Sequence, residues 1–209
     1  MAAPFLFPVG QDLGPVFTNP DATMPERYDI RISDGVVMLE ASEYQLWWLA
    51  HSTPELVKAN GGWDRSHVES YAAHYNIANA GDMIDQLVAD QVLAQVDSEE
   101  EAIRTFALEH RIFPLQRSLG NTAAEPFTYK LGMTPEGAVS VDVDVFQLWT
   151  FGHQSESLHH AAVILAKQRA DNEEMPDEMI PTAEELTEDF VLALPGLLAS
   201  QVLYLDRRD

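Results

Sequence analysis

Apolar and polar positions along the chain form two kinds of segment, and both kinds return in the same order in the second half. Residues 28–41 (YDIRISDGVVMLEA) and 127–145 (FTYKLGMTPEGAVSVDVDV) alternate between apolar and polar residues. Such alternation predicts β-hairpins, with turns at Ser33-Asp34-Gly35 and at Pro135-Glu136-Gly137. These turn residues tolerate the tight or left-handed backbone that a hairpin loop requires.

Each hairpin is followed by a segment with helical spacing. In residues 43–51 (EYQLWWLAH), Tyr44, Trp47, Trp48 and His51 stand at positions i, i+3, i+4 and i+7, which is one face of a helix. Residues 145–153 (VFQLWTFGH) repeat this pattern. Ser42 is a candidate N-cap for the first helix, and the second has an Asp at the same position.

Further helices are expected in both halves. In the first, a loop or short broken helix at residues 52–63 leads to a helix that Asp64 caps, and residues 79–97 form a third helix whose end becomes a strand. In the second, residues 156–170 and 182–206 follow the same plan. Pro195 should kink or restart the last helix, because proline lacks the amide donor of a helix interior.

The two halves align block by block. Gln45, Leu46, Trp47 and His51 fall on identical residues at a shift of 102. FPVGQDLG (7–14) matches FPLQRSLG (113–120) at a shift of 106, and QVL (91–93) matches QVL (201–203) at a shift of 110. Conserved block order with small insertions indicates tandem duplication.

The order of strands, helices and a closing strand is typical of an α+β winged-helix unit. We therefore expect two tandem winged-helix-like domains, at 1–100 and 101–209, the second carrying an acidic insertion at 171–182. Residues 99–112 (EEEAIRTFALEHRI) are themselves helical in pattern and can link the two.

The first half resembles a known family of binding modules. DGVVMLEASEYQLWWLAHSTPELV, followed by AAHYNIANAGDMIDQLVADQVLAQV, is similar to the winged-helix peptide-recognition modules of the PqqD-like group. The resemblance covers about half of the chain. It implies that a leader peptide adds as a strand beside 36–40 and rests against the helix at 82–91. The residues expected to contact a partner are Val36, Met38 and Glu40 on the strand, Asp82, Asp85 and Asp90 on the helix, and Trp63 in the loop as an interface anchor. The three aspartates also fit the solvated side of an amphipathic helix.

The strong negative charge of the chain limits the kinds of partner that it can bind. The chain holds 34 acidic and 12 basic residues, a formal net charge of −22. Such a surface repels the phosphate backbone of nucleic acids, so direct binding of DNA is not expected. The acidity serves solubility alone, or it attracts a basic partner or mimics a polyanion.

Composition favours a cytoplasmic protein. The chain contains no cysteine, so it has neither disulfides nor thiolate metal sites. No apolar run reaches the roughly 20 residues of a membrane-spanning helix. The first residues, MAAPFLFPVG, lack the basic start of a signal peptide.

We find no catalytic constellation in the sequence. It has no phosphate-binding loop, no nucleophile-elbow motif and no dinucleotide fingerprint. His153, Glu156 and His160 can be drawn as a metal site, but His51 has no equivalent cluster, and a His that ends a helix more simply bonds its last carbonyls. Asp142 and Asp144 alternate with valines as an outward strand edge would.

Taken together, these features predict a non-enzymatic binding or adaptor protein without a cofactor or metal. Its partner would be a peptide or protein with a basic face. The alternative is an acidic regulator, or nucleic-acid mimic, that sequesters a DNA-binding protein.

Overall fold

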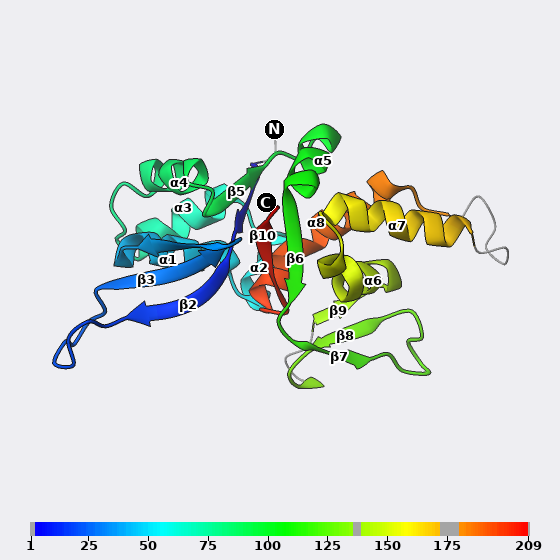
Figure 1. Cartoon of the computed structure of the whole chain (residues 1–209), viewed down its shortest axis with the longest axis horizontal. Helices are drawn as coiled ribbons and strands as arrows, with labels where there is room; N and C mark the ends of the chain where they lie inside the picture. Colours follow the sequence, from blue (N-terminus) through cyan, green and yellow to red (C-terminus); the bar gives the residue numbers. More distant parts are fainter. Residues whose placement is uncertain (1–2, 136–138, 172–179, 209) are drawn as a thin grey trace.

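The computed structural model describes residues 3–135, 139–171 and 180–208, and it is a mixed α+β fold. Figure 1 shows the first half on one side and the second half on the other, with β5, β6 and β10 between them. The expected α+β class is therefore correct at this level. Among the described residues, no helix is long and apolar enough to span a membrane.

The two halves have closely similar element orders. The elements of the first half are β1 (Phe5–Pro8), β2 (Gln11–Val16), β3 (Arg27–Ile32), β4 (Gly35–Leu39), α1 (Ala41–His51), α2 (Pro54–Asn60), α3 (Arg65–His74), α4 (Ala80–Ala89) and β5 (Leu93–Val96). After α5 (Glu100–Glu109), those of the second are β6 (His110–Pro114), β7 (Arg117–Gly120), β8 (Tyr129–Gly132), β9 (Val139–Val141), α6 (Val143–Phe151), η2 (Gly152–Gln154), α7 (Leu158–Ala170), α8 (Ala183–Ala199) and β10 (Leu203–Arg207). A short 3₁₀ turn thus stands where the first half has α2.

Strand pairing is also the same in both halves. The first and last strands of each half pair antiparallel, β1 with β5 and β6 with β10. The three strands between them form an antiparallel meander, β2-β3-β4 or β7-β8-β9. The sequence pattern predicted the hairpins within each meander, but not the pairing of each half's ends.

The same glycine β-bulge occurs at equivalent positions in the two halves. Gly14 (φ +88°) and Gly120 (φ +79°) lie where the register shifts between the first two strands of each meander. Each glycine amide donates to the side chain two residues earlier, at Asp12 or Ser118. A positive φ at such a bulge favours glycine, which explains why LG ends both aligned blocks.

The last helix of each half ends in the same way. Gln91 (φ +64°) and Gln201 (φ +51°) adopt the left-handed conformation just after α4 and α8. The next amide, of Val92 or Val202, then bonds the carbonyl five residues earlier. This Schellman closure turns the chain from the helix into the closing strand.

Buried side chains form two hydrophobic clusters, one for each half. The first includes Leu46 and Trp47, and the second includes Leu148 and Trp149. The β1–β5 ribbon contributes to both, because its neighbouring residues Leu6 and Phe7 face opposite sides. The halves consequently share a wall of side chains.

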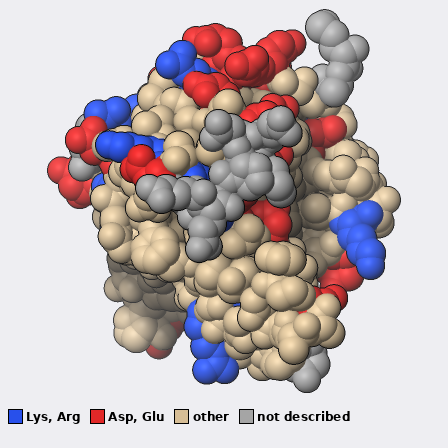
Figure 2. Space-filling model, turned by 90° about the vertical axis from the view of Figure 1, so that its right-hand side faces the viewer, with Lys and Arg blue, Asp and Glu red and all other residues tan. Residues whose placement is uncertain are grey.

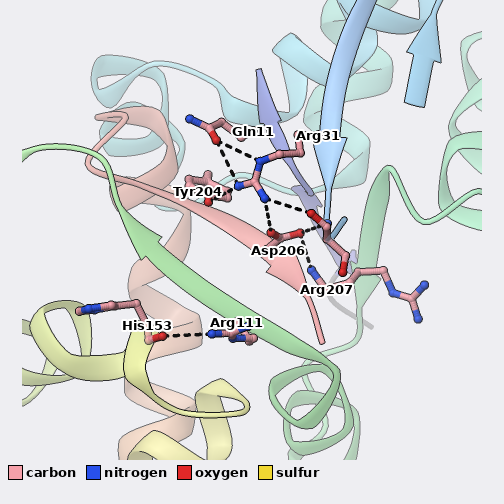
Figure 3. A network of polar contacts seen from close by, with 8 residues as sticks. Gln11, Arg31, Arg111, His153, Tyr204, Asp206 and Arg207 are labelled. Atoms are coloured by element: carbon pink, nitrogen blue, oxygen red, sulfur yellow. Dashed lines mark hydrogen bonds and ion pairs between the residues drawn. The ribbon is translucent and has the colours of Figure 1, made fainter. Parts of the chain in front are cut away.

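A polar network joins the halves at the strand β10 (Figure 3). The Arg31 guanidinium on β3 contacts Gln11, Tyr204 and the Asp206 carboxylate, the last at 3.6 Å. Asp206 is only 3% exposed and also accepts the amide of Ser33 at 2.7 Å. A buried carboxylate with these donors fixes the β3–β4 turn against the second half.

Several local expectations are wrong. The helix N-caps are Glu40 and Asp142, two residues before the expected positions, because the strands end at Leu39 and Val141 and the helices begin immediately afterwards. Asp142 therefore caps a helix and does not lie on a strand edge. Of the two effects expected of Pro195, the restart is wrong, because α8 is continuous through it. The expected turn at 135–137 lies partly, and the insertion at 171–182 largely, outside the described residues.

Candidate functional site

The candidate site begins at the free edge of β4. Within the described residues, β4 pairs with β3 alone, so the backbone groups along its other edge have no strand partner. Val36 and Met38 point outward and are 53% and 62% exposed, whereas Leu39 on the opposite face is buried. The strand therefore presents an apolar, unpaired edge.

Acidic side chains stand at both ends of this edge. Asp34 precedes β4 in the hairpin turn and is exposed, and Glu40 follows it, also exposed. The Glu40 amide donates to the Glu43 carboxylate at 2.8 Å, which holds a second negative charge at the same end. The nearest cations on the sheet are engaged elsewhere, because Arg27 pairs with Asp29 at 2.8 Å and Arg31 with Asp206.

The sheet beneath β4 is held rigidly on α1. The Tyr28 ring on β3 stacks on that of Tyr44, with centroids 4.0 Å apart. The Tyr44 hydroxyl donates to Asp12 at 2.9 Å on the first strand of the meander. Burial, and secondarily the Asp12 carboxylate, raise the pKa of Tyr44 to about 12, so the hydroxyl stays protonated and keeps donating. The edge is therefore presented on a fixed platform.

The acidic helix residues lie apart from this edge. Helix α4 packs against α1, α3 and β5, while β4 packs against β3 and α1. Asp85 pairs with Arg65 at 2.6 Å, and Asp90 accepts the side chain of Gln86. Asp82 is exposed in the first turn of α4. The structure thus places Val36, Met38 and Glu40 together, but it does not bring the three aspartates to them.

Trp63 is a core residue and not an exposed interface anchor. It is 3% exposed, and its indole Nε1 donates to the carbonyl of Leu49 at 3.0 Å. Its ring stacks on that of His67, with centroids 5.2 Å apart. The loop position suggested exposure, but the indole bonds α1 at Leu49 and its ring packs against His67 and Tyr71 of α3.

Beside Trp63 lies a cavity of about 630 Å³ that the sequence did not indicate. Its aromatic lining residues are Trp48, Trp63, Tyr71 and Tyr75, and its polar lining residues include Gln45 and Ser52. Ala199 and Gln201 of the second half close one side. Only the packing of the two halves assembles this lining, so no local motif could predict it.

The histidines near the end of α6 do not converge. Glu156 pairs with Arg208 at 3.0 Å, and the carbonyl of His153 accepts Arg111 at 3.1 Å (Figure 3). His51 does bond the carbonyl four residues earlier, Trp47 O at 3.1 Å, as expected for a His ending a helix. His153 departs from that expectation, because it lies in the following 3₁₀ turn and its buried Nδ1 has no partner among the described residues.

No protein-family model, curated protein or solved structure matches the chain. The resemblance to peptide-recognition modules therefore stays a hypothesis, and function must be argued from the geometry of the β4 edge and its surroundings.

Proposed function

We propose that this protein is a non-enzymatic binding protein that captures an extended segment of a peptide or protein partner along β4. The observation that supports this most directly is the edge of β4, which has no strand partner among the described residues and carries the exposed Val36 and Met38. Natural proteins usually protect such an edge with lysine, proline or a covering element. An added strand would complete its hydrogen bonds and cover its apolar side chains.

The charges at the ends of β4 define the partner's chemistry. Asp34 and Glu40 are six positions apart, which is about 20 Å along a strand. A segment with an apolar centre and Lys or Arg at both ends matches this spacing. Complementary charge of this kind fixes register and speeds encounter more than it adds affinity.

The second half provides a natural comparison. In its corresponding strand, β9, the position aligned with Met38 is the exposed Ser140. We propose that the halves are two copies of a winged-helix-like unit, supported by their shared strand pairing, bulges and helix ends. On this view, the first copy carries the recognition edge.

Selection of peptides from a random displayed library on the full chain tests the proposal. We expect enriched segments of six to eight residues with β-branched or aromatic centres and a basic residue at each end. The Met38→Lys variant should bind them at least tenfold more weakly, because it places a charge on the apolar edge, while the matched Ser140→Lys variant should bind normally. Equal binding by the Met38→Lys variant would rule out the β4 edge.

The acidic-regulator alternative has its own support. Exposed glutamates gather at the start of the two packed helices α5 and α8, at residues 99–101 and 184, 185 and 188. Figure 2 shows acidic side chains clustered at the top of the molecule, the end at which Figure 1 draws α5. Acidic residues also stabilise a helix start, which explains part of this placement. Competition between this protein and DNA for one basic DNA-binding protein would test the alternative.

A further inference from the structure

The aromatic cavity beside Trp63 has the features of a second binding site, separate from the β4 edge. Its volume of about 630 Å³ lies within the range of small-molecule sites, which are concave and mostly apolar with a few polar groups. Four helices, α1, α2, α3 and the end of α8, contribute to the walls. A hollow lined by four elements fits a compact molecule better than an extended chain.

The lining carries no charged side chain, although the chain as a whole has a net charge of −22. Besides the hydroxyls of Tyr71 and Tyr75, the polar side chains at the cavity are those of Gln45, Ser52, Thr53 and Gln201. A charged ligand would lose its hydration there without a counter-ion, which is costly. The lining therefore favours an uncharged ligand that exchanges hydrogen bonds with amide and hydroxyl groups.

The aromatic walls specify the rest of the ligand. Trp48, Trp63 and Tyr71 are partly or fully buried, and Tyr75 stands at 61% exposure by the opening. Aromatic faces pack on other aromatic rings with a gain beyond the buried area. The Trp63 nitrogen is already bonded to Leu49 O, so its N–H is not available to a ligand.

Ser52 adds an independent sign of a binding site. Its backbone (φ +63°, ψ −162°) lies in a region that is almost restricted to glycine, and such strain gathers at ligand sites. Its hydroxyl has one weak contact, to its neighbour's carbonyl at 3.5 Å. Ser52 lines the cavity, so its hydroxyl can exchange this contact for a bond to a ligand.

The second half has a corresponding cavity that lacks these features. It measures about 440 Å³ and is also lined by uncharged residues, but Phe151 is its single aromatic side chain. Counted from the helix N-caps Asp64 and Ser157, Tyr71 and Tyr75 correspond to Ile164 and Gln168. The aromatic lining is therefore particular to the first half and is not a requirement of the shared fold.

From these observations we propose that the cavity binds a small, uncharged molecule with an aromatic ring and a hydrogen-bonding group on its edge. This site is distinct from the β4 edge in location and in ligand chemistry.

Titration of the ¹⁵N-labelled full chain with p-cresol tests this proposal, because the four tryptophan indole N–H signals report separate places. We expect saturable shifts of the Trp48 and Trp63 signals, while the Trp149 signal, in the other core, stays unchanged. Benzoate, with a carboxylate on a similar ring, and cyclohexanol, without aromaticity, should each bind at least tenfold more weakly.

The variants provide a matched pair. Tyr75→Ala changes an exposed side chain and should weaken p-cresol binding roughly three- to tenfold. Phe151→Ala, in the cavity of the second half, should leave it unchanged, as should Met38→Lys. Absence of a saturable shift at millimolar p-cresol, equal binding of cyclohexanol or benzoate, or equal weakening by Phe151→Ala would each overturn the proposal.

Discussion

The two repeated tryptophans are expected to differ in their contribution to stability, although both are buried and occupy aligned positions. Trp47 Nε1 donates to Val9 O, and Trp149 Nε1 donates to Val202 O, each at 3.0 Å. The acceptors differ, because Val202 O also receives the amide of Leu115 at 2.9 Å. Within the part of the chain that the structure describes, Val9 O has only the indole as a donor.

Replacement of each tryptophan by phenylalanine makes use of this difference. Both changes lose a similar part of a buried ring, which costs about 1–2 kcal/mol. Trp47→Phe additionally leaves a buried carbonyl without a donor, at about 1–3 kcal/mol, whereas Trp149→Phe leaves Val202 O with its amide donor. We therefore expect Trp47→Phe to lower the free energy of unfolding by about 1–2 kcal/mol more than Trp149→Phe.

Urea unfolding of the full chain, followed by far-UV circular dichroism, measures both losses. Each loss is taken from the transition that contains the substituted half, since the two cores need not unfold together. Equal losses, or a larger loss for Trp149→Phe, would refute the assignment of a single donor to Val9 O.

Three further changes test other parts of the structure by the same unfolding measurement. Burial lowers the pKa of His51 to about 4 in the folded protein, whereas an unfolded chain takes up this proton near pH 6.5. The free energy of unfolding therefore falls by roughly 3 kcal/mol as the pH drops from 6.5 toward 4. The free energy of unfolding should thus fall less steeply over that range in His51→Gln, and equal slopes would contradict the burial. Arg31→Met should cost about 1–3 kcal/mol by leaving Asp206 without its side-chain cation, and a second change, Asp206→Asn, should recover part of the loss; no recovery would show that the charge is not the cause. Gln91→Gly should stabilise the protein by about 0.5–1 kcal/mol because it relieves a positive φ at the end of α4, and a destabilised variant would refute this.

Local pattern predicted most elements of the fold. The spacing of Tyr44, Trp47 and Trp48 gave helix α1, and Asp64 caps α3 as expected. The alternation in 28–41 gave the β3–β4 hairpin with its turn at Ser33 and Asp34. These helices and turns are determined by residues that are close in sequence, so they can be predicted from the sequence alone.

Long-range packing could not be derived in this way. The pairing of β1 with β5 joins residues about ninety positions apart, and neither strand's pattern names its partner. Pro195 stays inside α8 because tertiary packing buries that turn, which outweighs the intrinsic cost of proline. The expectation for Trp63 was wrong for the same reason, because only the folded chain brings its ring against α1 and α3.

The candidate site likewise contains a part that the sequence could predict and a part that depends on long-range packing. Val36, Met38 and Glu40 are close in sequence and belong to one edge, so their grouping was predictable. The aspartates of α4 depended on a groove between distant elements, and the aromatic cavity depends on contact between the halves. The position of these aspartates and the lining of the cavity are therefore both set by tertiary packing, which local sequence patterns do not show.

Amide hydrogen exchange tests the central claim, recognition along β4, most directly. The full chain is compared alone and saturated with a segment selected on it. The account predicts slower exchange at the β4 amides, residues 35–39, with residues 139–141 of β9 unchanged. Slower exchange confined to other elements, with β4 unchanged, would contradict it.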